Sequence, residues 1–166
     1  RLVSLVNNVS SLYDAREYDA IVSSGENATA GLMALTLQNM GVSARSWQGW
    51  QVPLITNSTH GSARIMEIPT QKLNEKFLDG MRVAVVAGFQ GLTSEGRVST
   101  LGRGGSDTTA VAFAAAFEAQ QCDIYTDVDG IFTADPRITN KAKKLNKISY
   151  EEMLELASLG AKVLQT

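Results

Sequence analysis

Apolar residues follow two patterns along this chain, helical spacing in some segments and short unbroken runs in others. Helical spacing predicts helices over residues 26–40 and 70–79, followed by Gly41 and Gly80, which suit helix C-termini. The apolar positions are Leu32, Leu35 and Leu37 among alanines in the first helix and, facing inward in the second, Leu73, Phe77 and Leu78. The alanine-rich residues 109–119 predict another helix able to pack close to a sheet, and residues 2–6 also look helical.

Short apolar runs predict strands between these helices. Residues 83–87 form a continuous run, which favours a central parallel strand covered on both faces. Residues 42–47 look extended, and residues 64–68 predict an edge strand. Residues 93–97 predict a turn, suited to the tip of a hairpin. Strands that alternate with helices predict an α/β fold with a mostly parallel sheet and helices on both faces.

The last third of the chain carries a helix-start signal. Ser149-Tyr150-Glu151-Glu152 is a capping box and predicts a helix through Leu159, closed by Gly160. Lys162 follows just past that helix end. No internal repeat, low-complexity tract or linker divides the chain, so we expect residues 1–166 to be one domain or a part of one.

Composition narrows the class of partner. Fifteen basic and seventeen acidic residues give a formal net charge of −2, with no polybasic run, which argues against nucleic acid. No stretch approaches the roughly 18 apolar residues of a membrane span, and no signal-peptide pattern is visible, so we expect a cytoplasmic protein. His60, the single histidine, has no companion at metal-ligand spacing.

A glycine pair opens the helix after residue 105. In Arg103-Gly104-Gly105-Ser106-Asp107 the glycines can take positive φ and let backbone N–H groups approach an anion at the positive end of the helix dipole. Arg103 adds a planar fork for a carboxylate or phosphate. The alternative is a simple glycine turn with Ser106 or Asp107 as N-cap.

A second polar cluster follows the apolar residues 122–125, which predict a buried strand with Cys122 packed as a small hydrophobe. Its sequence is Thr126-Asp127-Val128-Asp129-Gly130-Ile131-Phe132-Thr133-Ala134-Asp135-Pro136-Arg137. A calcium loop is disfavoured because the remaining EF-hand ligands are missing, and we interpret Asp129 as a turn residue. An Asp-Pro turn with solvated acids is the open alternative. Together with the first cluster, it predicts a nucleotide pocket at the carboxyl ends of parallel strands.

These two clusters resemble the aspartate kinases of the amino-acid kinase family. Three further stretches match family motifs in the same order, namely Ser23-Ser24-Gly25-Glu26, Ala87-Gly88-Phe89-Gln90-Gly91 and Gly160-Ala161-Lys162-Val163-Leu164. The resemblance covers essentially the whole chain. It implies a three-layer αβα sandwich, the amino-acid kinase (carbamate-kinase-like) fold, present here in incomplete form.

The resemblance also implies a role for each site residue. Arg103, Gly104, Gly105 and Ser106 would bind aspartate, and Glu26 would reach its ammonium group or order the pocket. Asp107 and Lys162 would be the catalytic residues, Asp107 organising the phosphate-binding lysines and Lys162 binding the β- and γ-phosphates. For Lys162 the alternative is a solvated lysine that offsets a helix C-terminus. The nucleotide-binding residues would be Thr126, Asp127, Phe132, Thr133, Ala134, Asp135, Pro136 and Arg137.

Within that set, Phe132 stands where the family often has tyrosine, so it could flank the adenine by stacking but offers no phenol. Asp135 and Arg137 would lie at the ribose and phosphates. The nucleotide would be ATP carrying Mg²⁺, held largely by phosphate oxygens and water.

The activity implied is transfer of phosphate from ATP to the β-carboxylate of L-aspartate, giving 4-phospho-L-aspartate, the first step of lysine, threonine and methionine biosynthesis. A carboxylate is already ionised near neutral pH, so no general base and no covalent intermediate are expected.

Acetylglutamate, glutamate and uridylate kinases share the scaffold, but the Arg103 to Ser106 block and Asp135-Pro136-Arg137 point to aspartate. P-loop and protein-kinase motifs are absent. A dinucleotide fingerprint is disfavoured because Asp107 stands where a third glycine or alanine belongs.

Compared with the family, the chain looks like a fragment of the catalytic domain. It lacks the preceding Lys-(Phe/Tyr)-Gly-Gly-(Thr/Ser)-Ser strand motif and the pair of regulatory ACT domains. The alternative function is therefore an inactive fragment that folds or self-associates and at most binds nucleotide. A homo-oligomer is compatible with either reading.

Overall fold

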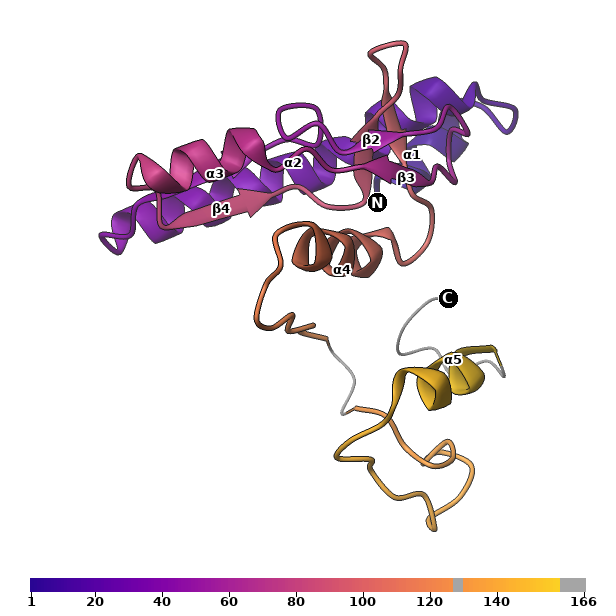
Figure 1. Ribbon diagram of the computed structural model, residues 1–166. Helices are drawn as coiled ribbons and strands as arrows, with labels where there is room; N and C mark the ends of the chain where they lie inside the picture. The colour runs from indigo at the N-terminus through magenta and orange to yellow at the C-terminus, as the bar shows by residue number, and fades with distance from the viewer. Residues whose placement is uncertain (127–129, 159–166) are drawn as a thin grey trace. The chain divides into compact units, whose positions relative to one another are not determined.

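The computed structural model describes residues 1–126 and 130–158, and it divides into two compact units, Arg1–Cys122 and Asp123–Thr166, which we describe separately. Figure 1 shows the helices and strands along the chain. Their bounds are α1 Leu2–Val9, α2 Ala15–Asn39, β1 Ala44–Trp47, β2 Ile55–Thr56, β3 Ile65–Glu67, α3 Gln71–Leu78, β4 Val83–Val86, β5 Gln90–Leu92, β6 Val98–Thr100, α4 Gly105–Ala116 and α5 Tyr150–Ser158.

Helix α2 begins well before residue 26, where the sequence pattern predicted its start. Asp14 caps it, since its carboxylate accepts a hydrogen bond from the backbone N–H of Arg16 at 2.8 Å. The Arg16 guanidinium binds the same carboxylate and holds the pKa of Asp14 well below its ordinary value. The motif that ends at Glu26 therefore lies inside a helix, because the cap and the tertiary contacts outweigh the helix-weakening Gly25.

The buried face of α2 is its alanine face. Ala30 and Ala34 are buried, whereas Leu32 and Leu35 are 66% and 63% exposed. An inward leucine stripe is thus absent from this helix. Small side chains let α2 lie close against β1, and the leucines on the other faces reach the surface.

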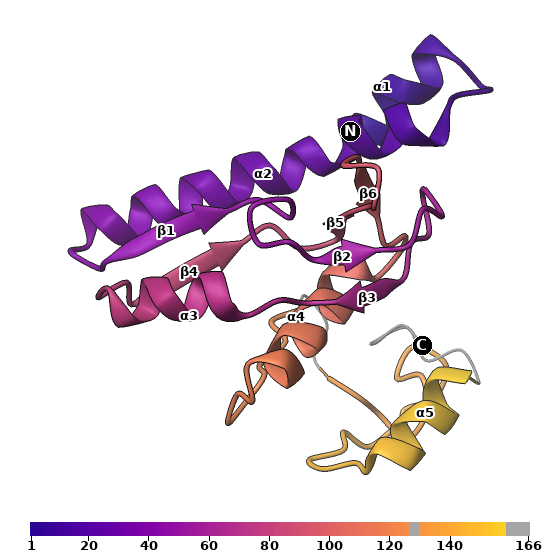
Figure 2. The ribbon, with the colours of Figure 1, turned by 45° about the horizontal axis from the view of Figure 1, so that its top comes forward.

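Strands β1 and β4 pair in parallel, with Ala44 opposite Val83 and Trp47 opposite Val86. Figure 2 shows this pair between α2 on one side and α3 on the other. Side chains of α3 and α4 pack on the Trp47 face in one core cluster, whose members are Val52, Leu73, Met81, Trp47, Ala84, Val86, Phe113 and Phe117. The predicted α/β fold with helices on both faces of parallel strands is confirmed.

Two details of this layer differ from the prediction. In the described part of the chain β4 pairs only with β1, and its four residues are half-buried rather than enclosed on both faces. Leu78, expected to face inward from α3, is 89% exposed, while Leu73 is 1% exposed. Leu78 is the last residue of the helix, beyond the turn that packs on the sheet.

The second sheet has the strand order β3-β2-β5-β6. The β2–β5 pairing is parallel, and the β2–β3 and β5–β6 pairings are antiparallel. Both the edge strand near residues 64–68 and the hairpin tip at residues 93–97 are confirmed, the latter closed by a 2.9 Å hydrogen bond from Thr93 N–H to the Arg97 carbonyl.

Residues 122–125 do not form the predicted buried strand. Cys122 is exposed and Tyr125 is 94% exposed, so Cys122 does not pack as a core hydrophobe. A segment this short, which also contains the charged Asp123, becomes a strand only where a neighbouring edge supplies hydrogen-bond partners, and the N-terminal unit ends at Cys122.

In the C-terminal unit the capping box of α5 is confirmed. Ser149 N–H donates to Glu152 Oε2 at 2.9 Å, and Glu152 N–H donates to Ser149 Oγ at 3.2 Å. Residues 131–133 run antiparallel to residues 143–145, with a bridge between Phe132 and Lys144.

Replacing Ser149 with alanine removes one half of this capping box. We expect the helix α5 to lose about 1 kcal/mol of stability, seen as faster amide exchange over its first turn. Ser149→Thr keeps the hydroxyl and should leave exchange within roughly twofold of wild type. Equal exchange in the alanine and threonine variants would contradict this role of the side chain.

Candidate active site

The glycine loop before α4 forms the backbone arrangement expected of an anion site. Gly102 and Gly104 are left-handed, with φ of 78° and 74°, and Gly104 is the N-cap of the twelve-residue helix α4. No side chain caps this end, so the alternative with Ser106 or Asp107 as N-cap is wrong; both lie in the first helical turn. Gly105 N–H already donates to the Gly102 carbonyl at 3.2 Å, so the N–H groups of Ser106 and Asp107 and the positive end of the helix dipole are the groups offered to a ligand.

Gly105 is needed for close packing rather than for positive φ. A Cβ at this position would lie 2.9 Å from Leu101 Cβ and 3.0 Å from Phe89 Cδ2. The loop is therefore pressed against the segment that follows β4, and a side chain at Gly105 would force the two apart.

That following segment, Gly88-Phe89, also contacts α4. The Phe89 N–H donates to Thr109 Oγ1 at 3.0 Å, and a Cβ at Gly88 would lie 3.5 Å from Ser106 Cα. Phe89 has φ of 67°, a conformation that strains a non-glycine residue by roughly 1–3 kcal/mol and that is often found at functional sites.

A third segment, residues 58–62, meets the same loop. The Gly61 carbonyl oxygen would lie 3.1 Å from a Cβ at Gly102. The anion loop is thus enclosed by two other loops, one after β4 and one between β2 and β3, and its position is set by tertiary contacts.

The polar side chains predicted for the substrate are accessible. Arg103 and Ser106 are exposed, and Asp107 is half-buried. Among the described residues no carboxylate forms an ion pair with Arg103. Glu26 is half-buried on α2, two turns beyond Asp19, and Asp19 is hydrogen-bonded to the end of β6. Asp19 thus links the helix that carries Glu26 to the strand that leads into the Arg103 loop.

The predicted nucleotide-binding residues that the structure describes lie in the C-terminal unit, apart from the substrate loop along the chain. Thr126, Thr133, Ala134, Pro136 and Arg137 are exposed, while Phe132 and Asp135 are half-buried. Asp127 and Lys162, predicted for nucleotide and phosphate, lie outside the described residues, as does Asp129.

Asp135 and Arg137 form a local pair. The Asp135 carboxylate accepts from Arg137 N–H at 2.8 Å, Nε at 3.1 Å and Nη2 at 2.8 Å. Asp14 and Arg16 make the same set of bonds at the start of α2. An Asp-x-Arg turn adopts this geometry by itself, as the Asp-Pro turn alternative anticipated, so the pair does not by itself indicate a ligand.

The Arg137 guanidinium lowers the pKa of Asp135, chiefly through its side-chain hydrogen bond. A lowered folded-state pKa means that the pair's stabilisation is present above the ordinary carboxyl pKa and is lost as pH falls through the lowered value. We therefore expect the Asp135 carboxyl, followed by NMR, to titrate below the ordinary aspartate range, and Arg137→Ala to return it there. An unchanged midpoint in that variant would contradict the assignment.

Sequence reasoning missed a buried polar cluster beside the substrate loop. Asp19 is 0% exposed and is hydrogen-bonded to His60 Nδ1 at 2.7 Å. The two residues lie far apart in the sequence, so spacing gave no signal; the lone histidine was the only clue. Among the described residues no group of three histidine, cysteine or acidic side chains could hold a metal.

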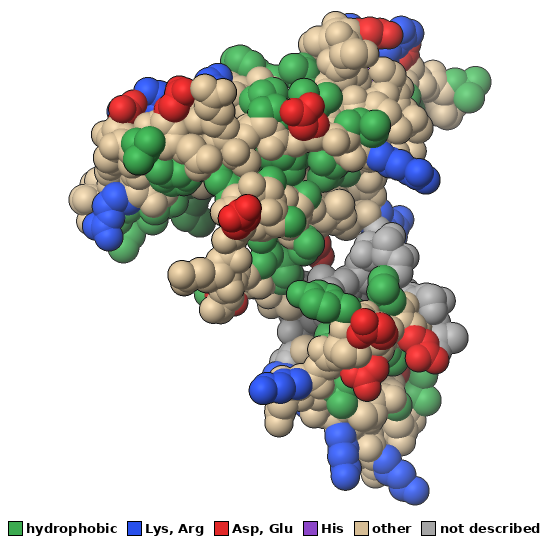
Figure 3. Space-filling model, viewed as in Figure 1, with side chains coloured by type: hydrophobic (Ala, Val, Ile, Leu, Met, Phe, Trp, Pro, Cys, Tyr) green, Lys and Arg blue, Asp and Glu red, His purple; other side chains and the backbone are tan. Residues whose placement is uncertain are grey.

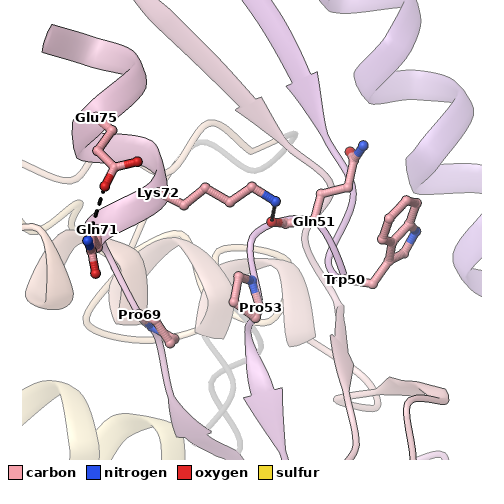
Figure 4. Close-up of a pocket in the computed structure, with 7 residues that line it drawn as sticks. All are labelled: Trp50, Gln51, Pro53, Pro69, Gln71, Lys72 and Glu75. Carbon is pink, nitrogen blue, oxygen red and sulfur yellow. Dashed lines mark hydrogen bonds between the residues drawn. The ribbon is translucent and has the colours of Figure 1, made fainter. Parts of the chain in front are cut away.

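A surface pocket of about 370 Å³ lies elsewhere, between the loop after β1 and α3 (Figure 4). Its lining residues are Trp50, Gln51, Pro53, Pro69, Gln71, Lys72 and Glu75. Its charged groups already have partners, since Lys72 Nζ donates to the Gln51 carbonyl at 2.9 Å and Gln71 Nε2 donates to Glu75 Oε1 at 3.1 Å. No residue predicted for the site lines it.

Charged side chains of both signs are interspersed on the surface shown in Figure 3, with apolar side chains between them. In the described part of the chain, no helix has both the length and the apolar character needed to cross a bilayer.

Comparison with known proteins decides which family this arrangement represents. The model of the amino acid kinase family matches residues 4–166. The chain belongs to the amino acid kinase family. Similar members include the aspartate kinase of Stutzerimonas stutzeri (strain A1501), 53% identical over 165 residues, and the aspartokinase of Rickettsia felis, 54% identical over 167 residues. These matches cover 99% of this chain but 40% and 41% of the relatives, so the chain spans about two fifths of their length.

Solved structures of the family agree with the fold. Aspartokinase III of E. coli in complex with aspartate and ADP, in its R-state, superposes with a TM-score of 0.85 at 35% identity, covering 98% of this chain and 37% of that one. The aspartate kinase from Synechocystis gives a TM-score of 0.78 at 45% identity, covering 98% and 26%. The amino-acid kinase fold and the resemblance to aspartate kinases are both confirmed.

Proposed function

We propose that the protein carrying this segment transfers the γ-phosphate of ATP to the β-carboxylate of L-aspartate, giving 4-phospho-L-aspartate and ADP. This is the first step of lysine, threonine and methionine biosynthesis. The observation that carries the proposal is the Gly102 to Ser106 loop, left-handed at two glycines, uncapped at the start of α4 and presenting an exposed arginine. The E. coli relative with this fold holds aspartate and ADP.

On the substrate side, the loop would bind an amino acid through opposite charges. Arg103 would bind a substrate carboxylate through its guanidinium fork, helped by Ser106 Oγ and the first N–H groups of α4. Glu26 would attract the ammonium group from α2. Such contacts fix the orientation of the second carboxylate, which is the one that reacts.

On the nucleotide side, Thr126, Asp127 and Phe132 to Arg137 would bind ATP, with Phe132 flanking the adenine. Lys162 would offset the charge of the β- and γ-phosphates, and Asp107 would orient the phosphate-binding lysines. Mg²⁺ carried by the nucleotide would neutralise developing charge on the phosphate oxygens, and those oxygens and water would supply most of its ligands.

The chemical step needs alignment more than acid–base groups. A carboxylate oxygen of aspartate attacks the γ-phosphorus, the bond to the β,γ-bridging oxygen breaks, and ADP leaves opposite the attacking oxygen. The attacking group carries no proton at neutral pH, so no residue is assigned as a base. Arg103, Lys162 and the α4 N-terminus would hold two anions together against their repulsion.

We further propose a cytoplasmic location, since ATP and free aspartate are cytoplasmic metabolites. We also propose that the protein forms a homo-oligomer.

A chimera tests the function directly. In it, this chain replaces the matching segment of the Stutzerimonas stutzeri aspartate kinase, to which it is 53% identical. We expect ATP-dependent formation of 4-phospho-L-aspartate, trapped as the hydroxamate, with glutamate and N-acetylglutamate as control acceptors. A folded chimera that binds neither aspartate nor ATP by calorimetry would refute the proposal and favour the inactive-fragment alternative.

A further inference from the structure

We propose that the buried Asp19–His60 pair positions the substrate loop, with Asp19 acting as a clamp between α2, the 58–62 loop and the end of β6. The consequence of this clamp for aspartate binding rests on the proposed function.

Asp19 lies on the buried face of α2 and is completely enclosed. Its Oδ2 accepts a hydrogen bond from His60 Nδ1 at 2.7 Å, and its Oδ1 accepts one from Thr100 Oγ1 at 2.5 Å. The Gly61 N–H lies 3.1 Å from both carboxylate oxygens. One carboxylate thus binds two segments that are far from α2 in the sequence.

A carboxylate in this environment needs such partners. Burying an ionised acid without hydrogen bonds and an opposite charge is strongly unfavourable. The three donors to Asp19 that the structure shows are His60 Nδ1, Thr100 Oγ1 and the Gly61 N–H, and the His60 side chain is 10% exposed. Since a carboxylate only accepts hydrogen bonds, Nδ1 carries the proton of this bond. His60 acts in this proposal as a positioning residue, since its Nδ1–H holds the Asp19 carboxylate.

The two clamped segments meet at the start of the substrate loop. Ala63 N–H donates to the Thr100 carbonyl at 2.8 Å, and the Gly61 carbonyl oxygen would lie 3.1 Å from a Cβ at Gly102. Gly102 then turns the chain with φ of 78°, and its carbonyl accepts from Gly105 N–H at 3.2 Å. The backbone that leads into Arg103 is thus supported at Thr100 and at Gly102 by the two segments that Asp19 holds.

This support decides where Arg103 is held, because its exposed side chain has no ion-pair partner among the described residues. When the clamp loosens, the guanidinium samples more positions. A bidentate bond to the substrate then costs more conformational entropy, because it has to immobilise the guanidinium. Aspartate affinity should fall while nucleotide affinity stays nearly constant.

The test compares His60→Ala with His60→Asn, since asparagine places an N–H donor close to the position of Nδ1. In the unliganded 166-residue chain, hydrogen exchange by mass spectrometry follows residues 58–63 and 99–105, with α3 as an internal reference. We expect roughly tenfold faster exchange in both segments for the alanine variant, and values within about twofold of wild type for the asparagine variant.

Thr100→Val and Thr100→Ser form a second pair that removes or keeps the other donor to Asp19, should His60→Ala fail to fold. In the chimera, we expect His60→Ala to raise KM for aspartate about tenfold and KM for ATP less than twofold. Asparagine should restore the aspartate KM.

Three results would overturn the proposal. The first is hydrogen exchange of the two loop segments that is unchanged in both His60→Ala and Thr100→Val. The second is exchange over α3 that accelerates as much as exchange of the loops. The third is a rise in KM for ATP as large as the rise in KM for aspartate. A wild-type chimera without aspartate turnover would instead refute the proposed function, while the exchange measurements would still decide whether the clamp positions the loop.

Discussion

Replacing Arg103 with alanine is expected to lower kcat/KM for aspartate about 100-fold in the chimera, mainly through KM for aspartate. A bidentate, charge-assisted bond to a carboxylate contributes roughly 3 kcal/mol when one partner is removed, which corresponds to that factor. Arg103 is exposed on a loop whose glycines fix its backbone, so truncation of the side chain removes the bond without disturbing the core. Steady-state kinetics with both substrates varied measures the effect.

A second substitution at Arg103 separates the effect of its planar pair of donors from the effect of its charge. Arg103→Lys keeps the charge but loses the planar pair of donors, and we expect a loss of roughly tenfold. Arg97→Ala is the matched control, because Arg97 is an exposed arginine that pairs with Glu17 at 2.6 Å outside the loop. Kinetic constants should stay within about twofold there. An Arg103→Ala enzyme with a normal aspartate KM would remove Arg103 from the site.

Replacing Gly91 with alanine is expected to destabilise the chain by about 3 kcal/mol or more. A Cβ at this position would lie 2.5 Å from Thr56 Cγ2, 2.6 Å from the Leu54 carbonyl oxygen and 2.7 Å from Leu54 Cδ2. These atoms lie where β5 packs against residues 54–56, the segment that contains β2. The Leu54 backbone cannot move away without breaking the 2.8 Å hydrogen bond from Leu92 N–H to the Leu54 carbonyl. Urea denaturation of the 166-residue chain gives the free energy of unfolding.

Gly31→Ala is the control for this substitution. Gly31 lies inside α2, and a Cβ there would meet nothing within 4 Å. We expect a gain of roughly 0.5–1 kcal/mol, because alanine is the better helix former. Similar destabilisation by both variants would show that the close contact at Gly91 is not the cause.

The elements that the sequence predicted well are those specified by neighbouring residues. The Ser149 capping box, the hairpin tip at residues 93–97 and the glycine loop before α4 each depend on side chains or backbone conformations within a few residues. Motif order likewise predicted the amino acid kinase family, because five motifs in sequence are highly specific.

The elements that the sequence predicted poorly depend on what lies across from them. An alanine stripe and a leucine stripe both satisfy helical spacing, and only the approach of α2 to β1 decides that Ala30 and Ala34 are buried. The run at residues 122–125 has the composition of a strand but not its structure. Hydrophobic spacing records which residues could be buried, not which neighbour is present to bury them.

The sequence by itself therefore determined the family, the fold class, the local turns and caps, and the glycine loop at α4. Only the tertiary structure decided that Asp19, His60 and Thr100 meet around one buried carboxylate beneath that loop. The physical reason is that a hydrogen bond across the fold leaves no periodic trace in the chain, because its partners come from elements whose packing, not whose spacing, brings them together.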